Sequence, residues 1–170
     1  HLGDVADTLR PETVDECVSI LIEEGIDGVM GNHEYSLVMH HFKRYPEKFS
    51  AETKHYVNSL PRLLEVEKIC FTHFSPFGGV HGLFAATDDI SYEETINHSR
   101  WPVIINGHSH DPRICRRSNG VVESINCHPN TPHQIDPNSR YILTCGALED
   151  SYCALFDFAR RRFEVILVDS

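Results

Sequence analysis

Four short segments of the chain carry side chains of the types that bind metal ions. They are Gly3-Asp4, Gly31-Asn32-His33-Glu34, Thr72-His73 and Gly107-His108-Ser109-His110. Each follows an apolar stretch that is expected to form a strand, and ligands at the carboxyl ends of strands can converge on one crevice. A carboxylate can bridge two cations, whereas imidazole and amide oxygen suit Mn, Fe, Zn or Ni. Two such ions would hold the attacking and leaving oxygens of an in-line displacement. The segments therefore predict a centre of two divalent metal ions.

The first two thirds of the sequence predict the strands that would place these segments. Apolar residues favour strands over residues 28–31, 69–74 and 101–106, each leading into ligand-type residues. Residues 2–5 are expected to be the end of a strand and the loop after it. With helices between them, these strands indicate the βα alternation of an α/β protein.

The helices that should separate these strands have recognisable start signals. Pro11 suits the first turn of a helix, Ser50 is a candidate N-cap, and Ser91 with Glu94 forms a capping-box pattern. The expected helices cover residues 11–24, 36–44, 51–60 and 91–98.

The final third changes character and predicts antiparallel strands. Residues 113–117 and 121–126 flank Ser118-Asn119-Gly120, which is a hairpin signal. Further strands are expected over residues 141–145, 152–158 and 162–168. One long irregular loop, residues 127–138, separates the two groups. Because it is long and rich in proline, we expect it to influence substrate choice as a lid or surface loop.

Composition and charge restrict the class of protein. The 170 residues suit a single domain, residues 1–170, and no apolar run is long enough to cross a bilayer. The formal net charge of −10 opposes broad neutralisation of nucleic-acid phosphates, so no extended nucleic-acid binding is expected. A small phosphorylated substrate held by cations remains compatible. The sequence leaves open whether the chain forms a homo-oligomer.

The six cysteines form no CxxC pair, which argues against a zinc knuckle. Most of them lie within apolar stretches, so reduced and buried thiols in a cytoplasmic protein are expected. The cysteines are Cys17, Cys70, Cys115, Cys127, Cys145 and Cys153.

Taken in order, the four segments resemble the motifs of the calcineurin-like metallophosphoesterases. Those motifs are Gly-Asp, Gly-Asn-His-Asp/Glu, a lone histidine after a strand, and Gly-His-x-His. The resemblance runs from Gly3 to the closing strands, where Cys145-Gly146-Ala147-Leu148 stands in the place of a Gly-Ser-Val of the small bacterial and archaeal members. It implies an α/β fold in which two mixed β-sheets pack as a sandwich flanked by helices. It also implies hydrolysis of a phosphomonoester or phosphodiester by a bridging hydroxide on two metal ions.

By this resemblance, Asp4 corresponds to the carboxylate that bridges both metals. Asn32, His73 and His108 correspond to the other ligands of one metal, and His110 to a ligand of the other. The ligand types do not distinguish Mn, Fe, Zn, Ni and Mg.

The resemblance also implies the residues that act on the substrate. Asn32 and His33 face the phosphoryl group, and His33 protonates the leaving oxygen. Asp7 stands where larger members carry an acid that orients this histidine.

Two departures from the family pattern are present. Larger members follow the acid with a phosphate-binding arginine, whereas Thr8 follows Asp7 here and Arg10 lies two residues further on. The DxH motif of the family's first strand is absent, and the chain begins at His1. We therefore expect a first strand to be missing and the second metal, left with Asp4 and His110, to bind weakly.

Each site residue also has an ordinary structural interpretation. A lone histidine such as His73 often only forms hydrogen bonds, Asp4 is a common turn residue, and Asp7 can cap a helix. Glu34 is expected to be an ordinary loop carboxylate. A third metal at Cys127, His128 and His133 is less favoured than a lid or a surface loop. The remaining histidines are expected to be surface or core residues; they are His40, His41, His55, His81 and His98.

Two other classes of function compete with the enzyme. A scaffold protein with this fold would bind partners without catalysis, and a sensor would bind a nucleotide without hydrolysing it. Retention of His33 and of all the later ligands favours the enzyme.

Overall fold

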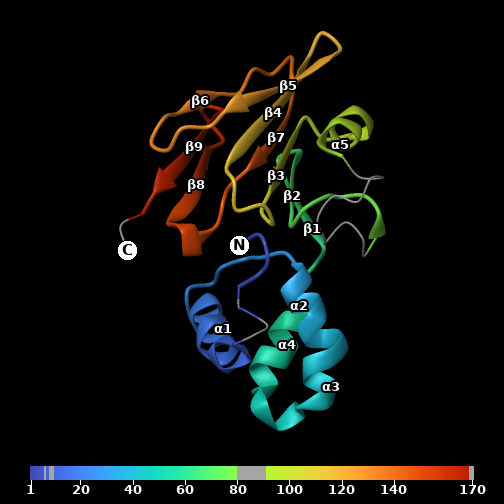
Figure 1. The fold of residues 1–170 in the computed structure, drawn as a ribbon, viewed down its shortest axis with the longest axis vertical. Coiled ribbons are helices and arrows are strands. Elements are labelled where there is room, and N and C mark those ends of the chain that lie inside the picture. The colour runs from blue at the N-terminus through green and yellow to red at the C-terminus, as the bar shows by residue number, and fades with distance from the viewer. Residues whose placement is uncertain (6, 8–9, 80–90, 169–170) are drawn as a thin grey trace.

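The computed structural model describes the chain apart from residues 6, 8–9, 80–90 and 169–170. Its larger sheet has six strands in the order β1-β2-β3-β7-β4-β5 (Figure 1). Strands β2, β3 and β7 are mutually parallel, while β1, β4 and β5 each run antiparallel to their neighbours. The strands are β1 (Leu63–Val66), β2 (Ile69–Thr72), β3 (Val103–Asn106), β4 (Arg113–Ser118), β5 (Val121–Asn126) and β7 (Arg140–Thr144).

The smaller sheet has three strands in the order β6-β9-β8, all antiparallel within the described part of the chain. They are β6 (His133–Gln134), β8 (Tyr152–Asp157) and β9 (Arg162–Leu167).

The two sheets pack face to face because side chains alternate across their strands. In β3, Val103 and Ile105 share a buried cluster with Phe163 and Val165 of β9, whereas Ile104 belongs to the cluster on the opposite face. Both faces of this central strand are therefore buried, as its continuous apolar run predicts. A fully buried side chain of this size contributes about 1.5–3 kcal/mol. The predicted sandwich of two sheets is confirmed, with a mixed larger sheet and an antiparallel smaller one.

Helix α5 (Tyr92–His98) covers the outer face of the larger sheet. Its residue Ile96 is buried with Trp101, Ile104 and Ile142. Ser91 caps the helix by accepting the N–H of Glu94 at 3.0 Å, as the sequence predicted.

The remaining α-helices lie together at one end of the sandwich (Figure 1). They are α1 (Val14–Glu23), α2 (Asn32–Ser36), α3 (Phe42–Arg44) and α4 (Ala51–Ser59), with a π-helical turn Leu37–His41 and 3-10 turns Pro11–Thr13 and Pro46–Lys48. Five side chains form their common core, namely Val14, Val18, Leu37, Phe49 and Val57. Ser50 caps α4 by accepting the N–H of Thr53 at 3.0 Å, as predicted.

The sheet delivers two of the ligand-type histidines to one edge. Strands β2 and β3 are parallel neighbours with Thr72 opposite Asn106, so the residues after them leave the sheet side by side. The N–H of Gly107 donates to the carbonyl oxygen of His73 at 2.9 Å, which ties the two loops together. This edge faces the helical end of the molecule (Figure 1).

Three sequence predictions about elements were wrong, and one strand was missed. Residues 28–31 and residues 2–5 form no strand, because single backbone bonds from Val29 to His1 and from Met30 to Pro61 replace a ladder. Strand β1 was missed, since its half-exposed Leu-Leu-Glu-Val sequence carries little signal. The helix expected from residue 36 begins at Asn32, so the Asn-His-Glu ligand-type residues lie in its first turn and not in a loop.

The long loop of residues 127–138 is less irregular than predicted. It contributes β6 to the smaller sheet, and Ile135 is 1% exposed within the core between the sheets. The N–H of Asn130 donates to the carbonyl oxygen of Val165 at 2.7 Å. These contacts fasten the loop along β9, so it is not a free lid.

No helix in the described residues is long and apolar enough to cross a membrane.

Candidate metal centre

Polar atoms of four residues, contributed by separate parts of the chain, converge where β2 and β3 end. His73 Nε2 lies 2.9 Å from Asn32 Oδ1, 2.9 Å from His108 Nδ1 and 3.3 Å from Asp4 Oδ2. Asn32 Oδ1 and His108 Nδ1 are 3.0 Å apart. The four residues predicted to bind one metal are therefore gathered in one place.

The ring nitrogen of His73 that carries the proton determines whether this cluster can bind a cation. Nδ1 lies 2.6 Å from the carbonyl oxygen of Leu2, which can only accept, so Nδ1 carries the proton. In the neutral ring, Nε2 then presents a lone pair to two oxygens and to another imidazole nitrogen. Lone pairs this close repel one another unless a proton or a cation lies between them. The donor set of carboxylate, amide and two imidazoles fits a divalent ion such as Mn, Fe, Zn or Ni.

The charges of Asp4 and His73 support each other. Burial alone would raise the pKa of Asp4, but the hydrogen bond and charge of His73, together with the backbone hydrogen bond from His33, lower that pKa. Burial would likewise lower the pKa of His73, but the Asp4 carboxylate raises it above its ordinary value. Burial and the charge of His73 lower the pKa of His108, which favours its neutral, ligand-competent ring. A proton on His73 would therefore compete with a cation for this cluster.

A polar network beneath the cluster holds the loop after β2 in place. Asn106 Nδ2 donates to the carbonyl oxygen of Phe74 at 2.9 Å, and Asn106 Oδ1 accepts from Thr144 Oγ1 at 2.8 Å. The ring of Phe74 packs edge-on against His108, with ring centroids 5.5 Å apart. These buried contacts fix the directions in which His73 and His108 leave the sheet.

The glycines that precede Asp4 and Asn32 permit a close approach of two backbones. A Cβ on Gly3 would lie 2.6 Å from the backbone of Gly31 and 2.8 Å from His73 Nδ1. A Cβ on Gly31 would lie 2.3 Å from Asp4 Oδ1. Any larger residue at these positions would push the Asp4 segment away from the cluster.

The fold that carries this cluster resembles that of an experimentally solved protein. The crystal structure of a metallophosphoesterase from Sphaerobacter thermophilus aligns with 99% of this chain and 76% of its own, with a TM-score of 0.76 and 21% sequence identity. The chain has the metallophosphoesterase fold. No protein-family model matches the sequence, and no curated protein matches it. The resemblance inferred from the motifs is therefore confirmed at the level of the fold.

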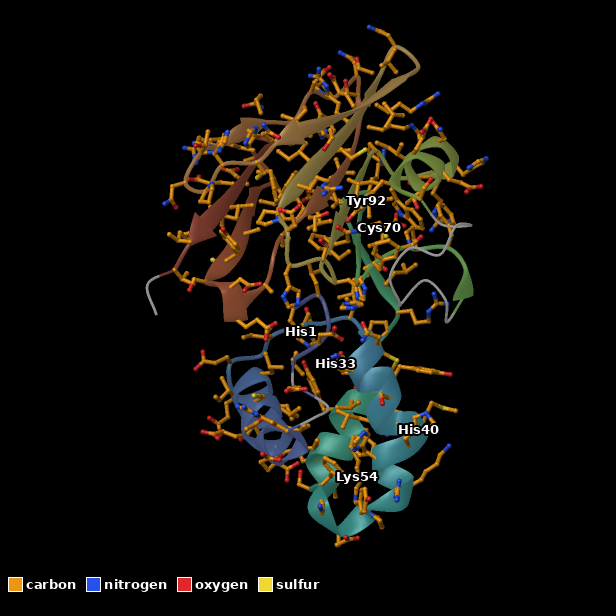
Figure 2. The ribbon with its side chains drawn as sticks, viewed as in Figure 1. His1, His33, His40, Lys54, Cys70 and Tyr92 are labelled. Carbon is orange, nitrogen blue, oxygen red and sulfur yellow. The ribbon has the colours of Figure 1, made fainter. Side chains whose placement is uncertain are left out.

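In this metallophosphoesterase fold, His33 lies beside the cluster. Its backbone N–H donates to Asp4 Oδ1 at 2.9 Å. Figure 2 shows His33 at the junction between the helices and the sheets. Asp7 is exposed, and its carbonyl oxygen accepts the N–H of Arg10 at 3.0 Å. The orienting role of Asp7 stays a prediction.

His110 belongs to a second group of ligand-type side chains. Its Nδ1 lies 2.9 Å from Asp150 Oδ2 and 3.1 Å from Glu149 Oε1, both in the 3-10 turn Leu148–Asp150. All three side chains are about half exposed or more. The sequence did not predict these two partners, and the role of His110 as a ligand of the second metal stays a prediction.

Sequence reasoning also undervalued Glu34, which is fully buried and accepts three backbone N–H groups. Its spacing after Gly31 is that of the glutamate in a capping box, and this signal was available in the sequence.

The other histidines lie outside the cluster where the structure describes them. His40 is exposed in the helical end (Figure 2), His55 and His98 are exposed, and His41 is half-buried. His81 lies outside the described residues.

Cys127, His128 and His133 are not gathered into a metal-type group in the described chain.

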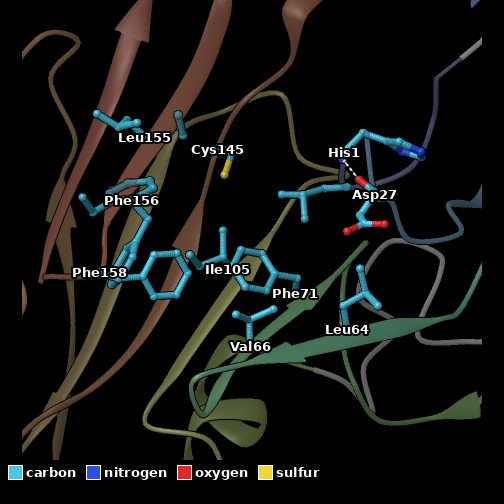
Figure 3. A pocket seen from close by; sticks show the side chains of 13 residues that line it. His1, Asp27, Leu64, Val66, Phe71, Ile105, Cys145, Leu155, Phe156 and Phe158 are labelled. Carbon is cyan, nitrogen blue, oxygen red and sulfur yellow. Dashed lines mark hydrogen bonds between the residues drawn. The ribbon is translucent and has the colours of Figure 1, made fainter. Parts of the chain in front are cut away.

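A cavity of about 370 Å³ between the sheets is separate in character from the cluster (Figure 3). Its lining is mainly apolar, and it includes Phe71, Ile105, Leu155, Phe156 and Phe158. The lining also includes His1, Asp27 and Cys145, but among the described residues a ligand-type group gathers at Asp4, His73 and His108 and not in this cavity.

Proposed function

We propose that the protein is a metal-dependent hydrolase that cleaves phosphomonoesters or phosphodiesters at a dinuclear metal centre. The observation that carries the proposal is the convergence of Asp4, Asn32, His73 and His108 within a metallophosphoesterase fold. These four residues would hold one ion, with Asp4 shared and His110 serving the second. The identity of the ions among Mn, Fe, Zn, Ni and Mg is open.

Ions bound there would neutralise charge on a phosphoryl group and activate water for attack. The chain's own residues would do the rest. Asn32 and His33 would face the phosphoryl group, and His33 would donate a proton to the leaving oxygen. The hydrogen bond from its N–H to Asp4 fixes the backbone of His33 next to the cluster. Asp7 would orient the ring and support its protonated form.

We propose a small phosphorylated partner and a cytoplasmic location, which charge and thiol chemistry support. A net charge of −10 disfavours extended nucleic acids and leaves a small phosphorylated molecule as the substrate class. All six cysteines are free, and burial raises the pKa of Cys70 and of Cys145 to about 12. Such protonated thiols are unreactive, and they support a cytoplasmic location.

Turnover of chromogenic esters tests the proposal directly. The metal-free protein, supplied with Mn²⁺, should hydrolyse a nitrophenyl phosphate or its diester, and chelation should abolish the activity. Binding of a nucleotide without turnover under any of the five metals would favour the sensor. If the protein neither binds a nucleotide nor hydrolyses an ester, the scaffold is favoured.

A further inference from the structure

Glu34 has more backbone contacts than a helix cap requires. Its side chain is 0% exposed, and Oε2 accepts the N–H of Gly31 at 2.8 Å, the ordinary contact of a capping box. The same oxygen accepts the N–H of Asp4 at 2.7 Å, and Oε1 accepts the N–H of Val5 at 2.9 Å. Two of the three bonds therefore reach a segment about thirty residues away, which carries the central carboxylate of the cluster.

The contact is reciprocal. Asp4 Oδ1 accepts the N–H of His33, so each carboxylate binds the backbone of the segment that carries the other. Asp4 Oδ2 is left to face His73 at 3.3 Å. The two carboxylates together set which oxygen of Asp4 points toward the helix and which points toward the cluster.

The backbone of Asp4 needs this support because its conformation is unfavourable. Its φ of 54° lies in the left-handed region, which residues with side chains rarely adopt. Such a conformation persists only where neighbouring contacts determine it. The bonds from Glu34 to Asp4 and Val5 lie on both sides of this strained residue.

The arrangement is also electrostatically costly. Glu34 is fully buried, and its carboxylate lies against the segment that carries the second carboxylate, that of Asp4. A second buried acid beside a metal-type carboxylate does not help a fold by itself.

We propose that Glu34 is a positioning residue of the metal centre, which fixes the backbone of Asp4 so that its carboxylate faces His73. The inference rests on the proposed function only in taking Asp4 as a metal ligand, and it requires no ester hydrolysis.

Glu34→Gln tests the inference, because glutamine has nearly the same size but only one acceptor oxygen. Its amide group would place a donor against an N–H of the Asp4 segment. Calorimetric titration should show a Kd for Mn²⁺ about 10- to 100-fold weaker than in the wild type, the usual scale for a group that orients a ligand. The visible absorption of bound Co²⁺, which reports ligand geometry, should change as well.

Asp15→Asn is the matched control. The Asp15 carboxylate accepts the N–H of Ser50 at 3.0 Å and 3.2 Å, so it also links two segments through the backbone, but among the helices. The Asp15→Asn substitution should lower the melting temperature while leaving the Mn²⁺ affinity and the Co²⁺ spectrum unchanged.

Wild-type affinity and an unchanged Co²⁺ spectrum in folded Glu34→Gln would overturn the inference, whatever its melting temperature. If this variant does not fold, Glu34→Asp replaces it, because its shorter side chain cannot reach Gly31, Asp4 and Val5 together. Wild-type affinity in folded Glu34→Asp would overturn the inference equally.

The outcome is independent of turnover. A wild-type protein that binds Mn²⁺ but hydrolyses no ester would contradict the proposed function, but it would leave the role of Glu34 intact. Hydrolysis by a protein whose Glu34→Gln variant binds Mn²⁺ normally would end only the inference.

Discussion

Replacing His33 with alanine should lower ester turnover by about 100-fold or more, the usual contribution of a general acid, while the metal content stays unchanged. His33 lies in the first turn of α2, next to Asn32, and its backbone N–H donates to Asp4 Oδ1. Among the described residues, the ligand-type atoms that gather with His73 Nε2 belong to Asp4, Asn32 and His108. Loss of the ring should therefore remove a proton donor and no ligand.

His40→Ala is the control for this substitution. His40 is an exposed histidine in the adjoining π-helical turn, away from the cluster (Figure 2). The ester turnover of the His40→Ala variant should equal that of the wild type. If His33→Ala empties the site of metal, and the metal-bound fraction works normally, His33 is a ligand and its assigned role is wrong.

Asp4→Asn should weaken Mn²⁺ binding by at least about 100-fold, because loss of a direct ligand costs more than loss of a group that orients one. Asparagine keeps an oxygen that can accept the N–H of His33, so the local backbone bond can persist. It loses the negative charge, and one neutral amide cannot bridge two cations as a carboxylate does. Both metal positions should therefore be depleted, which elemental analysis would measure.

Asp27→Asn is the control, because it removes the same negative charge at a residue that is not a proposed metal ligand. Asp27 is exposed, and its carbonyl oxygen accepts from the N-terminal amine of His1. The metal content of the Asp27→Asn variant should match that of the wild type. A metal content in Asp4→Asn that equals that of the wild type would exclude Asp4 as the shared ligand.

The four clustered residues were assigned from the resemblance of their motifs, and local strand patterns explain the placement of two of them. His73 and His108 each follow a short apolar strand, and parallel strands deliver such residues to the same edge of a sheet. The caps at Ser50 and Ser91 were predictable for the same reason, since a cap depends on residues within one turn.

The features that escaped prediction depend on contacts between distant residues. The capping bond of Glu34 could be inferred from its spacing after Gly31, but its bonds to Asp4 and Val5 could not, because backbone N–H groups leave no mark in a sequence. The pairing of His110 with Asp150 spans forty residues of sequence. Residues 28–31 have the composition of a buried strand, yet they lack a neighbouring ladder to complete one.

Calorimetric titration of Mn²⁺ into the metal-free protein tests the central claim most directly, because the claim is that Asp4, Asn32, His73 and His108 form a metal site. One tight binding event per chain is expected, with any second event much weaker, since His110 has only its exposed acidic neighbours and Asp4 to share. The tight event should vanish in His73→Ala and persist in His110→Ala. Absence of tight binding in the wild type, or tight binding that survives His73→Ala and vanishes in His110→Ala, would contradict the claim.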